Sequence, residues 1–110
     1  MSEPRSVRLS GESPAFHDAG IEDRELVVDG VRWALVEYGA GQGRADWCHV
    51  PHCGYVVGGA LRYEFEDGRE PLVVEAGDAF VLPPAPGHRG RNDGSVPASL
   101  FLIDALPERG

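Results

Sequence analysis

Three Asp-Gly pairs, at Asp29-Gly30, Asp67-Gly68 and Asp93-Gly94, divide this chain of 110 residues. Asp-Gly favours the two-residue type I′ turn, because both central residues of that turn adopt positive φ angles. The pairs lie next to short segments rich in apolar residues. In residues 61–66, for example, Leu, Tyr and Phe alternate with charged residues, so that one face of a strand meets a core and the other meets water. The pattern predicts antiparallel strands joined by tight turns.

The expected strands follow from these turns. They are residues 25–28 with 31–36 around the first turn, residues 61–66 with 72–75 around the second, and residues 98–103 after the third. No segment of eleven or more residues shows the apolar spacing of a helix, and 24 Gly and Pro residues are spread along the chain. Strands at intervals of about 8–12 residues predict an all-β sandwich or barrel. We expect one domain over residues 25–110, preceded by an N-terminal arm over residues 1–24.

Charge and composition narrow the possible functions. The net charge is −8, and such a surface repels phosphate groups, so nucleic acid and anionic membranes are not expected partners. The sequence has no Lys and no Thr, which excludes Schiff-base catalysis by lysine, a P-loop lysine and a threonine nucleophile. The polar N-terminus carries no apolar run typical of a signal peptide or membrane span, so we expect a cytoplasmic protein.

Cysteine and histidine concentrate in one segment, Asp46-Trp47-Cys48-His49-Val50-Pro51-His52-Cys53. Because successive side chains of a strand point to opposite faces, Asp46, Cys48 and His52 are expected on one face, provided that Pro51 introduces no bulge. The same alternation places Cys53 on the other face. Three potential ligands therefore converge on one side of the predicted strand.

A fourth ligand is expected from the proline-rich turn at residues 83–88, which ends at His88. Thiolate and imidazole suit Zn²⁺ or Fe²⁺ better than Mg²⁺ or Ca²⁺. We therefore predict one divalent transition metal ion, Zn or Fe, held by Cys48, His52 and His88, with Asp46 completing or supporting the set.

Residues 51–61, followed by residues 77–84, resemble the two motifs of small, bacterial-type single-domain cupins. The resemblance covers residues 46–92. It implies a double-sheet antiparallel β-barrel of the jelly-roll type, a metal site and pairing into a homodimer. Cupins catalyse dioxygenase, isomerase, lyase and cyclase reactions, and others bind ligands without turnover, so the resemblance leaves the reaction open.

The second motif matches the family pattern G-x5-P-x-G-x2-H-x3-N from Gly77 to Asn92, with Ala85 in place of one glycine. His88 takes the position of the family's metal histidine. An alternative alignment inserts two residues before Gly87, and it retains His88.

The first motif departs from the family pattern. When it is anchored on Gly59, His52 stands where cupins have a glutamate, and Asp46 and Cys48 stand where they have two histidines. By the resemblance, the usual ligands of three His and one Glu become Asp46, Cys48, His52 and His88.

Each predicted ligand also has a structural interpretation. Cys48 could be a buried thiol or half of a local disulfide with Cys53, and His52 could be a core histidine bonded to the backbone. His88 lies next to arginines and could bind an anionic substrate instead of a metal. Asp46 could be a solvated carboxylate.

The functional prediction is a metal-dependent enzyme acting on a small molecule, with Tyr55, Arg62 and Tyr63 contacting the substrate. The aromatic residues would also serve as barrel core. The alternative is a cupin that binds or senses a small molecule without catalysis.

Overall fold

The computed structural model describes residues 3–14 and 20–105, which form eight strands and one short 3-10 helix, η1 (Leu9–Gly11). The strands are β1 (Ile21–Val28), β2 (Val31–Tyr38), β3 (His52–Gly58), β4 (Ala60–Phe65), β5 (Leu72–Glu75), β6 (Ala79–Leu82), β7 (His88–Arg91) and β8 (Ala98–Ala105). The predicted all-β class is confirmed. None of the described segments forms a helix long and apolar enough to span a membrane.

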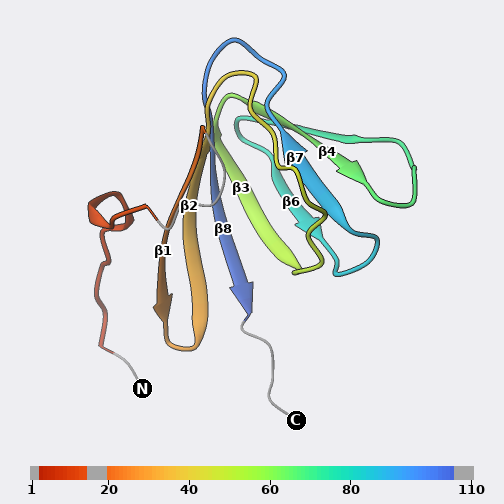
Figure 1. Cartoon of the computed structure of the whole chain (residues 1–110). Helices are drawn as coiled ribbons and strands as arrows, with labels where there is room; N and C mark the ends of the chain where they lie inside the picture. Colours follow the sequence, from red (N-terminus) through yellow and green to blue (C-terminus); the bar gives the residue numbers. More distant parts are fainter. Residues whose placement is uncertain (1–2, 15–19, 106–110) are drawn as a thin grey trace.

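The strands form two antiparallel sheets (Figure 1). A five-stranded sheet has the order β1-β2-β8-β3-β6, and a three-stranded sheet has the order β5-β4-β7. The sheets do not close into a continuous barrel, but the arrangement is the predicted jelly roll. The first strand starts at Ile21, within the segment predicted to be an arm.

The first predicted turn is confirmed. Val28 pairs with Val31, and the two residues between them have positive φ angles of 51° at Asp29 and 77° at Gly30. This is the backbone that a type I′ turn requires, and Gly adopts it without steric cost.

The second predicted turn is wider than expected. The β4–β5 register is centred on Asp67-Gly68, but pairing stops at Tyr63 and Leu72. The Gly68 amide donates to the Phe65 carbonyl at 3.0 Å, so the chain turns over a longer loop.

The third Asp-Gly pair does not form a hairpin, because β7 and β8 lie in different sheets. The buried side chain of Asn92 holds this connection. Its amide donates to the carbonyl oxygens of Tyr38, Gly39 and Val96 at 2.8–3.2 Å, and its own oxygen accepts from the Gly94 amide. The asparagine of the second motif therefore has a structural role here.

The core lies between the facing sides of the two sheets. Its largest fully buried apolar side chains are Ile21, Val36, Val56, Leu61, Leu82 and Leu100. Gly54 of β3 faces the same interior, where a Cβ atom would lie 2.4 Å from the Phe80 ring. Glycine at this position lets Phe80 pack against the sheet.

The β2–β3 connection, residues 39–51, joins the two sheets at one end of the core. It forms isolated bridges to β7, pairing Gly43 with Arg91 and Cys48 with His88. Through these bridges a loop that follows the large sheet is fixed to the small sheet. This attachment positions the candidate site.

Candidate functional site

Cys48, His52 and His88 form one cluster, in which the potential ligand atoms lie within 4.8 Å of one another. Cys48 Sγ lies 3.7 Å from His52 Nε2, and the two imidazole rings have centroids 5.1 Å apart. His88 is 2% exposed, and the other two side chains are half-buried. The structure thus brings together three of the four predicted ligands.

Backbone pairing holds Cys48 and His88 next to each other. Cys48 and His88 exchange two hydrogen bonds, of 2.7 and 2.9 Å, as a hydrogen-bonded antiparallel pair does. Side chains of such a pair project from the same face, so the thiol and the imidazole lie next to each other. Strand alternation does not run from Asp46 to His52, because β3 begins only at His52. Cys48 reaches the site by pairing with β7.

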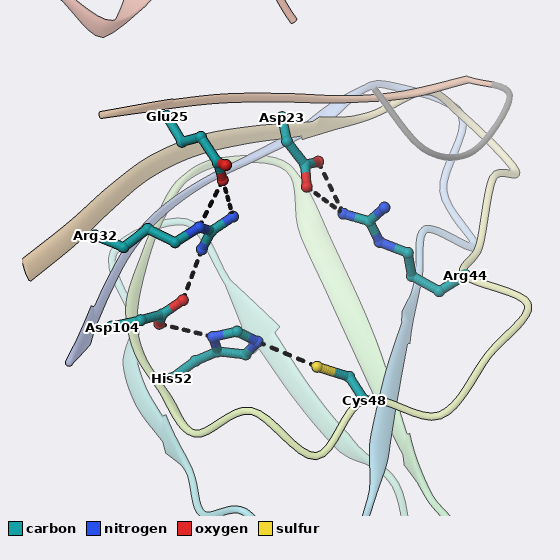
Figure 2. Close-up of polar contacts among 7 residues, drawn as sticks. All are labelled: Asp23, Glu25, Arg32, Arg44, Cys48, His52 and Asp104. Atoms are coloured by element: carbon teal, nitrogen blue, oxygen red, sulfur yellow. Dashed lines mark hydrogen bonds and ion pairs between the residues drawn. The ribbon is translucent and has the colours of Figure 1, made fainter. Parts of the chain in front are cut away.

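His52 is oriented by Asp104, a residue of β8 that is 3% exposed (Figure 2). Asp104 Oδ1 lies 2.7 Å from His52 Nδ1. Asp104 Oδ2 accepts from Arg32 Nη1 at 2.6 Å, and Arg32 also pairs with Glu25. With Nδ1 held by a carboxylate, His52 presents Nε2 to Cys48. This contact fixes the ring orientation of His52, as a carboxylate does for histidines that bind metals.

The contacts shift the pKa values of both side chains. The hydrogen bond to His52, helped by His88, lowers the pKa of the Cys48 thiol to about 5. Burial lowers the pKa of His52, but the hydrogen bonds to Asp104 and Cys48 outweigh burial and raise that pKa to about 9. In this metal-free geometry Cys48 is a thiolate paired with a protonated His52 at neutral pH, and a metal ion bound through Nε2 would displace that proton. Thiolate is the form of cysteine that binds metals.

His88 is the least satisfied polar residue of the site. Its two ring nitrogens are buried, and within the described part of the chain neither has a partner at hydrogen-bonding distance and angle. The Cys48 thiol, whose pKa His88 helps to lower, lies within 4.8 Å, too loosely placed to count as such a partner. Buried polar atoms are nearly always paired, so an unpaired imidazole beside a thiolate needs an explanation. Tyr63 covers the ring edge-on at a centroid distance of 5.9 Å without hydrogen bonding to it. A metal ion bound by one nitrogen would give that nitrogen a partner.

The cluster opens into a cavity of about 650 Å³ between the two sheets. Its apolar wall comes from Val36, Leu100 and Leu102, and Tyr63 also lines it. Burial raises the pKa of the Tyr63 phenol well above its ordinary value, which keeps the phenol neutral. This volume is in the range of cavities that hold small molecules.

Charged side chains line the rest of the cavity. Arg44 donates to both oxygens of Asp23, at 2.8 and 3.1 Å (Figure 2). The Arg44 guanidinium lies 5.5 Å from the centre of the Tyr38 ring. Near the loop, Arg89 stacks on the Trp47 ring at 4.1 Å. The cavity therefore combines an apolar wall with arginines that carboxylates hold in defined positions.

The structure separates the other predicted site residues. Asp46 is exposed and lines the cavity, but its carboxylate is not part of the ligand cluster. Of the three predicted substrate contacts, Tyr63 lines the cavity. Tyr55 and Arg62 do not line the cavity, because each alternates with buried residues along its strand and therefore points to the outer side of its sheet. Tyr55 is 47% exposed on the outer side of β3, and Arg62 pairs with Asp93 at 2.7 Å.

Both cysteines are free in the structure. Cys53 is exposed and points away from the cavity, as the alternation along β3 predicts for a neighbour of His52. The alternative of a local disulfide is not what the structure contains.

Sequence reasoning missed the charged residues that support the site: Asp23, Glu25, Arg32, Arg44 and Asp104. A usable signal was present in the strands. Asp104 continues the inward side of β8 after Leu100 and Leu102, so the alternation places a carboxylate in the interior. A charged residue at a core position of a strand is the pattern that would have found it.

Comparisons with known proteins agree with this architecture. The sequence model of the family described as "Cupin domain" matches residues 32–104. No curated protein matches the chain.

Among solved structures, a polyketide cyclase from Streptomyces resistomycificus matches with a TM-score of 0.80 and 13% identity, over 98% of this chain and 83% of that chain. An oxalate decarboxylase from Bacillus subtilis, described as having Mn(II) centres, matches with a TM-score of 0.77 and 24% identity, over 94% of this chain and 30% of that one. The cupin domain of an XRE-family transcriptional regulator from Enterobacter cloacae matches with a TM-score of 0.68 and 14% identity, over 81% and 99% of the two chains. The chain spans 58% of the length of an oxalate oxidase that it also resembles. At these identities the likeness concerns the fold alone.

Proposed function

The chain belongs to the cupin family, and from that premise we propose that it is a metal-binding cupin that acts as a metal-dependent enzyme on a small molecule. The observation that carries the proposal is the buried, unpaired imidazole of His88 next to Cys48 and His52. A hydrogen-bonded core histidine would not leave both nitrogens without a partner.

The donor set fits one divalent transition metal ion. Cys48, His52 and His88 would hold it, and Asp104 Oδ1 contacts Nδ1 of His52, the ring nitrogen that does not face Cys48. One thiolate and two imidazoles favour Zn²⁺ or Fe²⁺, whereas Mn²⁺ prefers carboxylate and water ligands. A bound ion would polarise a substrate carbonyl or carboxylate, or supply redox chemistry if it is iron.

The cavity residues would bind the substrate. Arg44 and Arg89 offer cationic groups to an anionic part of a small molecule, and the apolar wall next to Tyr63 excludes water from it. The reaction remains open among dioxygenase, isomerase, lyase and cyclase chemistry. We further propose that the protein works in the cytoplasm as a homodimer, as the sequence predicts.

The second candidate is a cupin that binds or senses a small molecule without turnover. It is favoured by the replacement of the family's glutamate by His52 and by the similarity in fold to a regulator's cupin domain. The two candidates differ in what happens to a bound compound. Small carboxylates that raise the melting temperature are incubated with metal-loaded protein and recovered. Converted compound supports the enzyme, and unchanged compound supports the binding module.

The metal is tested first, by elemental analysis of protein expressed with added Zn²⁺ or Fe²⁺. We expect near-stoichiometric metal in the native protein and a large loss in Cys48→Ser, His52→Ala and His88→Ala. Matched controls are Cys53→Ser and His49→Ala, because Cys53 points away and the exposed His49 is bonded to Glu66 at 2.8 Å. Native protein holding less than about 0.1 equivalent, with no increase in melting temperature on adding metal, contradicts the proposal.

A further inference from the structure

Cys48, His52 and Asp104 form a continuous chain of side-chain contacts (Figure 2). Cys48 Sγ lies 3.7 Å from His52 Nε2, and His52 Nδ1 lies 2.7 Å from Asp104 Oδ1. A nucleophile, a histidine and a carboxylate that orients the histidine meet in this order in the catalytic triads of hydrolases. Both ring nitrogens of His52 are therefore engaged as a triad engages them, and we call these three residues the triad.

The carboxylate of the triad is held in place by its own contacts. Asp104 is 3% exposed, and its second oxygen accepts from Arg32 Nη1 at 2.6 Å. Arg32 also pairs with Glu25 (Figure 2). Because Arg32 engages Oδ2, Oδ1 stays directed at His52 Nδ1. The imidazole ring is thereby kept with Nε2 toward the sulfur.

The triad is accessible to a small molecule. All three of its residues line the cavity of about 650 Å³, whose volume suits a small molecule rather than a polypeptide. His88 lines the same cavity, and among the described residues its ring nitrogens have no hydrogen-bond partner. An N–H group of this ring is therefore available to donate to an oxygen atom that gains negative charge beside Cys48.

We propose that the metal-free protein hydrolyses small carboxylic esters, with Cys48 as the nucleophile, His52 as the acid and base, and Asp104 as a positioning residue. The apolar wall of the cavity, which includes Leu100 and Leu102, would take the acyl group. This activity does not rest on the metal-dependent function. A bound ion would occupy Cys48 Sγ and His52 Nε2 and would block the reaction.

The reaction needs water and no other co-reactant. Cys48 Sγ, whose proton is held by His52 Nε2, attacks the ester carbonyl carbon and forms a carbon–sulfur bond. The carbon–oxygen bond of the ester breaks, and the departing alcohol takes the proton from His52. Water then attacks the thioester while His52 takes one of its protons, and the acid leaves as the sulfur is regenerated. One ester and one water thus give one acid and one alcohol.

The two cysteines allow a test on the native full-length protein, with EDTA present and para-nitrophenyl acetate as the probe. Both thiols are free, but Cys53 is exposed and Cys48 is half-buried, so solvent access alone predicts faster acetylation of Cys53. We expect Cys48 to be acetylated at least about tenfold faster, because a neighbouring acid–base group accelerates its attack. Fragmentation mass spectrometry reads both sites. Equal rates, or a faster rate at Cys53, overturn the proposal.

Variants test turnover, which is followed by the release of para-nitrophenol. Cys48→Ser and His52→Ala should abolish turnover, whereas Cys53→Ser should leave it unchanged. Asp104→Asn should lower kcat at least about 100-fold with little change in KM, because it disturbs the His52 tautomer and not the bound ester. Asp93→Asn is its control, because Asp93 also joins two arginines but is exposed. Turnover that survives Cys48→Ser, or that falls equally in the two asparagine variants, overturns the triad.

Zinc distinguishes this proposal from the metal-dependent function. We expect stoichiometric Zn²⁺ to suppress the hydrolysis, because the ion binds the sulfur and the nitrogen that the reaction uses. Hydrolysis that requires metal and is absent in EDTA overturns the triad and supports the metal-dependent enzyme. Acetylation of Cys48 without regeneration of the thiol also overturns the hydrolysis. A protein that binds no metal contradicts the proposed function alone, because acetylation of Cys48 is measured without any ion.

Discussion

Asp104→Asn is the sharpest test of how the site is built. The substitution preserves the size of a side chain that is 3% exposed, so it opens no cavity, but it removes the charge shared by His52 and Arg32. If the Asn oxygen faces His52, the amide group faces the Arg32 guanidinium, and two donors oppose each other. If the amide is reversed, it faces His52 Nδ1 and favours the tautomer with a proton on Nε2. That tautomer cannot bind a metal through Nε2.

The expected magnitude follows from these contacts. Loss of the carboxylate that orients a histidine ligand typically lowers metal affinity by about 10- to 100-fold, or about 1.4–2.7 kcal/mol. Arg32 keeps Glu25 as a partner and remains partly exposed, so the free energy of unfolding should fall by about 1.5–3 kcal/mol rather than by the cost of a fully orphaned charge.

The assay is Zn²⁺ affinity by competition with a chromophoric chelator, with urea unfolding measured in parallel. Asp93→Asn is the matched control, because Asp93 also joins two arginines, Arg62 at 2.7 Å and Arg91 at 3.0 Å, but lies exposed outside the cavity. It should leave metal affinity unchanged. If Asp104→Asn binds Zn²⁺ within about threefold of the native protein, Asp104 does not position His52 and our reasoning is refuted.

Three further predictions concern stability and ionisation. Gly54→Ala should lower the free energy of unfolding by about 1–3 kcal/mol, because the added Cβ meets the Phe80 ring. Gly58→Ala in the same strand places its Cβ in open space and should have little effect. Urea unfolding compares the two variants, and equal effects would contradict this packing argument. Asn92→Ala should lower the free energy of unfolding by about 2–4 kcal/mol, because it leaves buried carbonyl groups unpaired. Urea unfolding measures this loss as well, and a loss below about 0.5 kcal/mol would refute the role of Asn92 in holding the β7–β8 connection. The pKa of Cys48 falls from 9.0 to about 5 on folding, and that of His52 rises from 6.5 to about 9. In metal-free protein the stability that Cys48 contributes is lost as pH falls from 9.0 to about 5, and the stability that His52 contributes is lost as pH rises from 6.5 to about 9. The two effects therefore cancel between pH 6.5 and 9. Between pH 6.5 and 5 only the Cys48 contribution changes, so the stability that the pair contributes falls as pH falls. The difference in unfolding free energy between native protein and Cys48→Ser should shrink over that lower range, and a constant difference would disprove the thiolate.

Much of the fold was readable from the sequence, because the alternation of side chains along a strand is a local property. Residues 61–66 already showed which side of β4 faces the core, and Asp29-Gly30 is one of the residue pairs that a type I′ turn accepts readily. The same local rule placed His52 and Cys53 on opposite faces. The motif spacing selected His88. Asp67-Gly68 and Asp93-Gly94 have the same local sequence, yet one lies in a wider loop and the other joins two sheets.

The tertiary structure decided which segments became neighbours. Cys48 meets His88 through backbone pairing between a loop and β7, and Asp104 meets His52 and Arg32 because β8 lies between β2 and β3. The sequence prediction that Tyr55 and Arg62 contact the substrate is not met in this structure, because strand parity turns both side chains outward. The order of strands in a sheet depends on hydrogen bonds and packing between residues far apart in the chain. A local pattern therefore determines which side of a strand a side chain occupies, whereas only the assembled sheets determine what that side chain contacts.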